Sequence, residues 1–300
     1  MTDDVPFFMQ IGAKQNNSIR RLLHQRFAFE QGEFDRGVDH VHASSLTNPD
    51  VGWCPREAVY AKQAPTPPHK TQTISASLSY TFEQGRWCES LIRDTLRDLI
   101  WGNWQCNFCK KLTEGVMEPK TCTHCDQGIQ GMTYVEVPLR GPMDLIGSPD
   151  LLLKIDGLFT IVELKILSAA DFKSLKAPKP EHRLRTQLYV DLLEYGIEQQ
   201  ILPINTPLDF NLSKAFVLYT SRGFGCMDPT LVDDGIHEKF TPWKCYPVAR
   251  NLNVWSDSMN KLSSRHNALL GGPLPERICD VQACKRAGQC SYTKKCFSDG

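Results

Sequence analysis

The chain lacks several features that would place it in a functional class at once. Its 300 residues contain 34 Lys+Arg and 34 Asp+Glu, so the net charge of zero gives no general affinity for nucleic acid, and any basic surface must be local. It has neither an apolar run long enough to span a membrane nor the glycine-rich phosphate loop of an ATP-driven motor. Its first residues, Met-Thr-Asp-Asp, do not form a secretory signal pattern. We therefore expect a cytoplasmic protein with no membrane partner.

Cysteine, in contrast, is abundant. Twelve cysteines without a secretory signal are expected to be metal ligands rather than disulfide partners. Two Cys-x-x-Cys pairs follow one another closely, Cys106 with Cys109 and Cys122 with Cys125. Four thiolates in this spacing predict a closed tetrahedral zinc site of the ribbon or knuckle type, with His124 as a less favoured ligand.

The pattern from residue 147 to residue 165 predicts a β-hairpin. Two apolar, β-rich runs flank Asp156-Gly157, a dipeptide typical of a two-residue hairpin turn. Glu163 and Lys165 are two residues apart in the second run, so both side chains point to the same face of the strand. Asp150 precedes the first run and is expected to lie close to them across the ladder.

Two carboxylates and one ammonium group in a strand are costly to bury unless a cation compensates their charge. Hard oxygen ligands suit Mg²⁺ or Mn²⁺, so Asp150 and Glu163 are candidate ligands. Lys165 is expected to orient a water molecule or to stabilise charge on a phosphate. Asp144 is the rival of Asp150, which we prefer because it lies at the mouth of the hairpin.

Asp150 followed by Glu163-Leu164-Lys165 resembles the Asp…(Asp/Glu)-x-Lys signature of the PD-(D/E)xK nuclease superfamily. The resemblance implies metal-dependent cleavage of phosphodiester bonds. A helix expected over residues 81–101 has an apolar stripe that also contains Glu89. In the superfamily, the helix before the catalytic sheet often supplies an acid, so the resemblance implies that Glu89 is a third metal ligand.

The expected elements follow the superfamily order αβββαβ, in a restriction-endonuclease-like α/β core. The first strand is predicted at residues 132–139, the second helix at 181–195 and the last strand at 214–220. RecB-like members carry a Gln-x-x-x-Tyr motif on this second helix. Gln187 matches, and its implied role is to orient substrate or the metal-bound network, but Asp191 replaces the tyrosine and Tyr189 lies two residues after the glutamine.

The stretch from residue 168 to residue 185 is locally basic, and only Asp171 and Glu181 oppose its positive charges. A positive segment beside a metal site suits a phosphate backbone. The candidate DNA-binding residues are Lys173, Lys176, Lys179, Arg183 and Arg185.

The polar tail after residue 270 contains Cys279, Cys284, Cys290 and Cys296. Such a tail cannot build a core, so a cofactor is expected to order it. One zinc ion could take all four cysteines. Alternatively, Cys54-Pro55-Arg56 resembles the first cysteine motif of RecB-like iron–sulfur exonucleases of the CRISPR-associated and phage type, which implies a [4Fe–4S] cluster. We favour this cluster with Cys54, Cys284, Cys290 and Cys296, while Cys279 remains the alternative to Cys284.

We expect three regions: a helical arm over residues 1–40 with a helix at 17–31, a nuclease core over 41–250 with a zinc insertion at 102–130, and a helix with an iron–sulfur tail over 251–300. The resemblance implies a DNA exonuclease acting on single-stranded ends in recombination, replication or repair, in bacterial or phage-infected cytosol. A helicase, a recombinase or a single-strand-binding protein are expected partners. The alternatives are a structure-specific endonuclease on the same core and a non-catalytic DNA-binding or assembly module.

Overall fold

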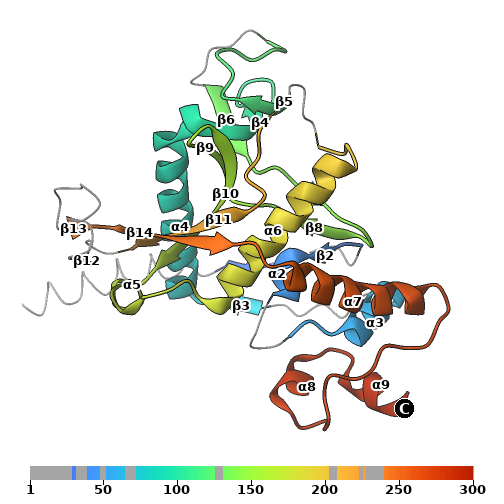
Figure 1. Cartoon of the computed structure of the whole chain (residues 1–300). Coiled ribbons are helices and arrows are strands. Elements are labelled where there is room, and N and C mark those ends of the chain that lie inside the picture. The colour runs from blue at the N-terminus through green and yellow to red at the C-terminus, as the bar shows by residue number, and fades with distance from the viewer. Residues whose placement is uncertain are drawn as a thin grey trace, which may run out of the picture.

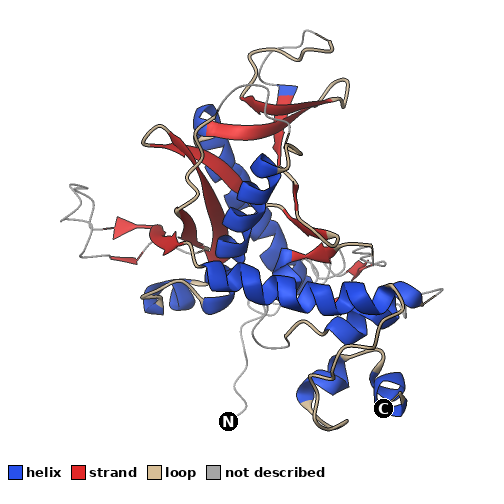
Figure 2. Cartoon of the chain, turned by 45° about the vertical axis from the view of Figure 1, so that its right-hand side comes forward, coloured by secondary structure: helices blue, strands red, loops and turns tan. Residues whose placement is uncertain are grey.

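The computed structural model describes residues 29–31, 39–47, 52–64, 72–125, 131–202, 208–222, 226–227 and 240–299. A seven-stranded mixed sheet lies at the centre, between helices (Figures 1 and 2). In spatial order its strands are β14 (Trp243–Ala249), β11 (Lys214–Ser221), β10 (Leu158–Leu167), β9 (Leu151–Ile155), β4 (Ile100–Cys106) and β5 (Leu112–Met117), with β6 (Met132–Val135) also paired to β4. None of the helices in the described ranges has the length and apolarity that a membrane crossing requires.

The predicted hairpin is confirmed. Strands β9 and β10 pair antiparallel, and Leu158 lies opposite Ile155. Asp156 and Gly157 both have positive φ, 51° and 85°, as a type I′ turn requires. Strand β10 also pairs with β11 in parallel, and Glu163 lies opposite Val217 of β11, one residue beyond the last pair with β9.

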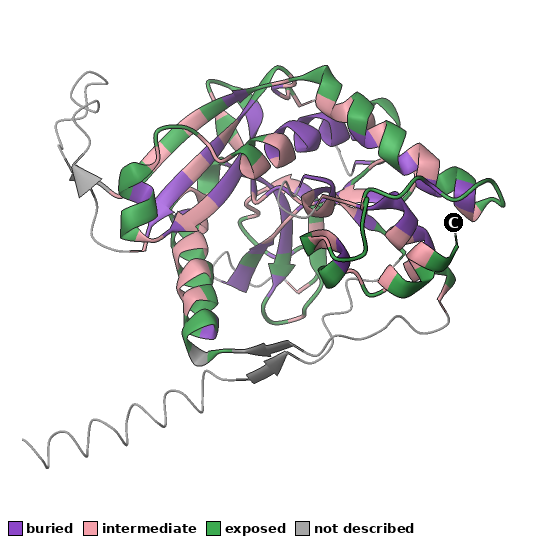
Figure 3. Ribbon diagram, turned by 90° about the horizontal axis from the view of Figure 1, so that it is seen from below, coloured by how far each residue is buried: buried purple, intermediate pink, exposed green. Residues whose placement is uncertain are grey.

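The two faces of the sheet pack against different helices. Leu151 belongs to an apolar cluster with Ile92 of α4 (Ala76–Thr95), whereas Leu152 belongs to a second cluster with Leu188 of α6 (Pro180–Glu198). Neighbouring strand residues point to opposite faces. Helices α4 and α6 therefore cover opposite faces. Much of α6 is buried, whereas α4 exposes most of its length (Figure 3).

Smaller elements complete the α6 side. They are α2 (Ala43–Leu46), α5 (Ala169–Ser174), α7 (Leu252–Leu269), and the three-stranded sheet of β2 (Val41–His42), β8 (Leu145–Gly147) and β7 (Leu139–Arg140). Gly147 packs tightly against α6, because a Cβ atom there would lie 2.6 Å from the Tyr189 ring. A two-stranded sheet joins β12 (Cys226–Met227) and β13 (Phe240–Thr241).

The strand beside the hairpin differs from the sequence-based expectation. Helix α4 ends at Thr95, a 3-10 turn (Arg97–Leu99) follows, and β4 starts at Ile100. Ile100 pairs with Leu153 of β9, so β4 is the strand beside the hairpin. The strand expected at 132–139 corresponds to β6, which pairs with β4 and not with β9. The helix expected over residues 81–101 therefore extends too far at its C-terminal end. The apolar residues of the helix are followed closely by those of a buried strand, so the change from helix to strand leaves no mark in the residue types. The expected insertion at 102–130 contributes β5 and most of β4 to this sheet.

The helix expected at residues 17–31 falls mainly outside the described residues. Its last part is a strand, β1 (Phe29–Gln31), which pairs with β3 (Gln72–Ile74). The expectation of helix is therefore wrong for these three residues, whose pairing with a distant strand has no signal in the local sequence.

The C-terminal segment packs against an early helix, α3 (Pro55–Gln63), as Figure 1 shows for α8 (Lys285–Gln289) and α9 (Thr293–Ser298). The Tyr60 hydroxyl donates a 2.9 Å hydrogen bond to Asp299, and Arg286 forms a 2.6 Å ion pair with Glu57. Residues more than 200 positions apart are thereby held side by side.

Candidate functional site

The hairpin brings Asp150, Glu163 and Lys165 together. Lys165 Nζ lies 2.7 Å from Glu163 Oε1 and 3.5 Å from Asp150 Oδ2. It also donates a 2.7 Å hydrogen bond to the Leu164 carbonyl. An ammonium group has three protons, and these three acceptors match them. The predicted clustering of the three side chains is present.

Glu163 is the most buried charged residue of this cluster. Its exposed fraction is 1%, and its Oε2 atom is buried without a hydrogen-bond partner. Burial, followed by repulsion from Asp150, raises the pKa of Glu163 to about 7, although Lys165 and Arg185 oppose this shift. A buried carboxylate oxygen without a donor is costly. A bound cation would satisfy it, so the residues present fit a metal ion.

Lys165 is held in its charged form. Burial opposes the charge, but the carboxylates of Asp150 and Glu163 outweigh it and raise the pKa of Lys165 above its ordinary value. A protonated amine cannot take a proton from water. It can donate hydrogen bonds and stabilise negative charge.

Helix α4 supplies Glu89 to the same region. Burial and then the negative charge of Asp150 raise the pKa of Glu89, while Arg93 and Lys165 lower it. Because Asp150 and Lys165 both contribute to this shift, the Glu89 carboxyl lies within electrostatic range of the hairpin cluster.

Sequence reasoning missed Glu136, which directly follows β6. Burial, followed by the charge of Asp150, raises the pKa of Glu136. Its carboxylate forms a 2.6 Å ion pair with Arg93, whose guanidinium lies 5.5 Å from the centre of the Tyr134 ring. A single glutamate in a β-rich run gives no signal, because only the pairing of β6 with β4 brings it near Asp150.

Helix α6 approaches the cluster from the other side. Arg185 NH1 lies 3.3 Å from Glu163 Oε1, so this residue, expected to bind DNA, contacts the buried carboxylate. One turn earlier, His182 bonds to the Tyr219 hydroxyl at 2.8 Å. Burial and then the charges of Lys165 and Arg185 lower the pKa of His182 to about 3, so the imidazole is neutral near pH 7.

The other members of the basic stretch lie between the end of β10 and the first turns of α6. Lys173, Lys176 and Arg183 are exposed, and Lys179 is half-buried where α6 begins. The structure thus places three of the five basic residues on the surface.

Gln187 is directed elsewhere. Its amide nitrogen donates a 2.9 Å hydrogen bond to the Ala249 carbonyl at the end of β14. Asp191, four residues later on the same helix face, bonds to Arg250 Nε at 2.7 Å. The structure therefore joins Gln187 to the edge strand rather than to Glu163 or Lys165. Asp144, the rival of Asp150, lies 3.5 Å from Arg265 of α7.

The four central cysteines converge at the far end of β4. All four sulfur atoms lie within 4.8 Å of one another, with 3.6 Å between Cys106 and Cys125 and 3.7 Å between Cys109 and Cys122. A tetrahedral ion with bonds of about 2.3 Å places its sulfur ligands about 3.8 Å apart. A hydrogen bond from the Cys109 backbone N–H lowers the pKa of Cys106 to about 6, opposed by burial. The cluster can bind a metal.

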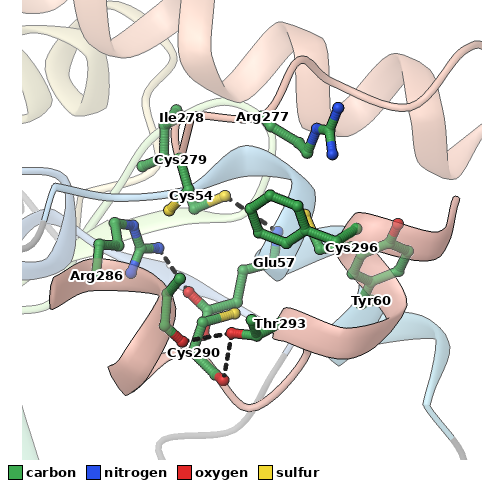
Figure 4. Close-up of a pocket in the computed structure, with 12 residues that line it drawn as sticks. Cys54, Glu57, Tyr60, Arg277, Ile278, Cys279, Arg286, Cys290, Thr293 and Cys296 are labelled. Carbon is green, nitrogen blue, oxygen red and sulfur yellow. Dashed lines mark hydrogen bonds and ion pairs between the residues drawn. The ribbon is translucent and has the colours of Figure 1, made fainter. Parts of the chain in front are cut away.

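A second group of cysteines surrounds a hollow between α3 and the tail. Cys54, Cys279, Cys290 and Cys296 line it together with Glu57 (Figure 4). Backbone N–H groups of Glu57 and Tyr292 donate to the sulfur atoms of Cys54 and Cys290, each at 3.4 Å. Four thiols, two of which accept backbone N–H groups, are a ligand set that suits an iron–sulfur cluster.

Cys284, preferred from the sequence, lies next to this hollow but does not line it. Its sulfur accepts a 3.2 Å hydrogen bond from the Ala287 N–H at the start of α8, and this bond lowers the pKa of Cys284. Burial, and then the neighbouring Cys284, raise the pKa of Cys279 to about 11. The structure thus favours Cys279 by position.

No protein-family profile matches the chain, and no curated protein matches its sequence. Among solved structures, it is similar to an alkaline exonuclease, LHK-Exo, from Laribacter hongkongensis, with a TM-score of 0.41 and 13% identity over 78% of this chain and 89% of that one. The structure of LHK-Exo in complex with dAMP gives a TM-score of 0.40 and 12% identity over the same shares. The functional proposal therefore rests on the geometry of the hairpin cluster.

Proposed function

We propose that the chain is a metal-dependent deoxyribonuclease of the PD-(D/E)xK type, acting as an exonuclease on single-stranded DNA ends. The observation that carries this proposal is the unpartnered Oε2 atom of buried Glu163, next to Asp150 and Lys165. A binding module has no need of a buried carboxylate that only a cation would satisfy. The resemblance of the Asp-…-Glu-x-Lys spacing to the nuclease superfamily supports the same conclusion.

Asp150 and Glu163, with Glu89 from α4, would hold Mg²⁺ or Mn²⁺ through carboxylate oxygens. When bound, such an ion polarises the scissile phosphate and lowers the pKa of the attacking water. Lys165 remains protonated and stabilises the negative charge that develops on the phosphate. Arg185 fixes one oxygen of Glu163, which leaves the other oxygen for the cation.

The DNA strand would reach these residues across the exposed basic surface of Lys173, Lys176 and Arg183. Each contact with a phosphate adds affinity that falls with salt and carries no sequence preference. Lys179 lies at the start of α6, where the positive end of the helix dipole adds to its charge.

End-labelled linear single-stranded DNA, incubated with Mn²⁺, tests this proposal. Wild type is expected to degrade it and Glu163→Ala is not. The order in which products shorten gives the polarity. A circular single strand separates the alternatives, because an exonuclease cannot start on it, whereas an endonuclease on the same core cuts it. If wild type cuts neither substrate, the assignment as a nuclease is wrong.

We also propose Zn²⁺ as the ion of the Cys106, Cys109, Cys122 and Cys125 site, because all four ligands are thiols at a tetrahedral spacing. The site joins two loops and would have a structural role. Metal analysis of the purified chain is expected to give one zinc per molecule, and the Cys109→Ser variant is expected to lose it.

For the tail we propose a [4Fe–4S] cluster held by Cys54, Cys290, Cys296 and either Cys279 or Cys284. Such a cluster would fasten the tail to α3. Anaerobically prepared protein is expected to be brown, with broad absorbance near about 400 nm, and Cys290→Ser is expected to lose the colour. A colourless protein that contains only zinc would contradict the cluster.

A cytosolic setting, with a helicase, recombinase or single-strand-binding protein as partner, would suit the proposed exonuclease activity.

A further inference from the structure

The first knuckle of the four-cysteine site exposes an aromatic ring beside two positive charges. Phe108 is 67% exposed, more than any other phenylalanine whose side chain the structure describes. Lys110 and Lys111 are exposed as well. No acidic residue occurs between residues 105 and 111. Exposing a large apolar ring next to lysines has no benefit for folding, which points to a partner with both negative charge and flat apolar groups.

The ring is also held in place. A Cβ atom added at Gly131 would lie 2.5 Å from a Phe108 ring carbon, so the ring rests against the Gly131 backbone. The loop itself is fixed, because the Lys110 N–H donates to the Cys106 carbonyl at 2.9 Å and Lys110 adopts a left-handed φ of 60°. A rigid aromatic ring loses little conformational entropy when it binds a ligand.

The knuckle is connected to the region of the hairpin cluster by one short strand. Cys106 lies opposite Met132, the first residue of β6, and Glu136 directly follows β6. Burial, and then the charge of Asp150, raise the pKa of Glu136. Four residues of extended chain span about 13 Å. In Figure 1, β4, β5 and β6 lie together at the end of the molecule opposite α8 and α9. The knuckle and the tail hollow therefore lie at opposite ends of the molecule.

We propose that Phe108, Lys110 and Lys111 form a binding surface for single-stranded DNA, in which Phe108 stacks on a base and the two lysines contact flanking phosphates. This inference rests on the proposed function and names the contact that would hold the strand next to the hairpin cluster. An aromatic ring with neighbouring cations is the combination by which single strands are bound without sequence preference.

The test measures binding, not cleavage. Every variant is made in a Glu163→Ala background, and fluorescence anisotropy follows a labelled oligothymidine of about 16 nucleotides, within the usual range of single-strand sites. Neither a divalent cation nor a chelator is added, so the cysteine site keeps its metal. The assay therefore gives an answer even if the wild-type chain proves not to cut DNA.

Phe108→Ala is expected to weaken binding by about 5- to 150-fold, the range for loss of one stacked base. Phe108→Trp is expected to retain the affinity, whereas Phe108→Leu, which keeps apolar area but cannot stack, is expected to resemble alanine. The double variant Lys110→Ala/Lys111→Ala is expected to lower the slope of log K against log salt by about 1.4.

Trp243→Ala is the matched control, because Trp243 is 53% exposed on β14, at the edge of the sheet away from β5. Unchanged affinity in Phe108→Ala, or equal loss in Trp243→Ala, would overturn the proposal. So would full affinity in Phe108→Leu, which would indicate an apolar contact of the kind that a protein partner makes. Thermal unfolding of each variant checks that the fold is retained.

Discussion

The backbone N–H of Leu164 donates a 2.6 Å hydrogen bond to Oδ2 of Asp150. The ladder between β9 and β10 ends at the pair of Leu151 and Val162, and Pro149 beyond it has no N–H to continue the ladder. The Asp150 side chain thus provides the last bond of the hairpin with one oxygen. The same oxygen lies 3.5 Å from Lys165 Nζ, so one carboxylate both closes the hairpin and contacts the cluster.

These two roles can be separated by substitution. Asp150→Asn keeps an oxygen that accepts from Leu164 but loses the charge, whereas Asp150→Ala leaves the N–H unpaired. We expect both variants to lose cleavage of single-stranded DNA. Only the alanine variant should show the additional cost of an unpaired buried donor, about 1–3 kcal/mol in the free energy of unfolding by urea. Equal destabilisation by both substitutions would show that the hydrogen bond has no structural role.

Arg183 and Arg185 are two residues apart on α6 but have different surroundings, which makes them a matched pair. Arg185 contacts Glu163, while Arg183 is exposed. Arg185→Ala should reduce kcat about 10- to 100-fold even at saturating DNA, the loss expected for one charge-assisted hydrogen bond. Arg183→Ala should leave kcat unchanged, raise KM, and lower the salt slope of binding by about 0.7. Steady-state rates at several salt concentrations distinguish the two, and similar effects on kcat would refute the separation.

The local signals in the sequence were sufficient for the hairpin and for α6. The turn dipeptide Asp156-Gly157 specifies its own geometry, and the period-two pattern places Glu163 and Lys165 on one face. The four central cysteines were equally predictable, because a metal-binding spacing needs only two short loops that meet. In each case the information lies within a few residues of the structure that it specifies.

The parts that were missed depend on contacts between distant segments. Glu136 reaches the cluster only because β6 pairs with β4, whose first two residues were read as the end of a helix. Arg185 was grouped with the surface lysines, since composition cannot tell which side of a helix faces the sheet. The sequence left the choice between Cys279 and Cys284 open, because spacing along the chain does not show which of the two sulfur atoms lines the hollow.

The buried imidazole of His182 predicts a loss of stability in acid. Its pKa is lowered to about 3 in the folded chain, while an unfolded histidine titrates near about 6.5. Above pH 6.5 both states are neutral and the residue has no pH-dependent effect. Below that value only the unfolded state takes up the proton, so stability should fall by up to about 1.4 kcal/mol per pH unit as the pH drops towards 3.

The variant His182→Gln should remove this contribution, because glutamine can still bond to Tyr219 but does not titrate. Urea unfolding between pH 4 and pH 7 should therefore show a shallower acid slope for the variant than for wild type. His266→Gln, at an exposed position on α7, is the control and should keep the wild-type slope. Identical slopes for wild type and His182→Gln would show that the imidazole is not kept neutral by the fold.

The last prediction concerns the choice between Cys279 and Cys284. Cys279 lines the hollow with Cys54, Cys290 and Cys296, whereas the sulfur of Cys284 accepts the N–H that begins α8. We therefore expect Cys279→Ser to lose iron and the absorbance near about 400 nm in anaerobic preparations. Cys284→Ser should keep most of the iron, since a serine hydroxyl can take over the hydrogen bond at the start of α8.

Cys245→Ser is the control for these measurements, because Cys245 lies on β14 and belongs to neither of the two cysteine groups. Iron analysis of the three variants gives the answer without an activity assay. Retention of iron in Cys279→Ser together with its loss in Cys284→Ser would restore the ligand set inferred from spacing alone. It would also mean that binding of the cluster moves Cys284 from the N-terminus of α8 into the hollow, at the expense of the hydrogen bond from Ala287.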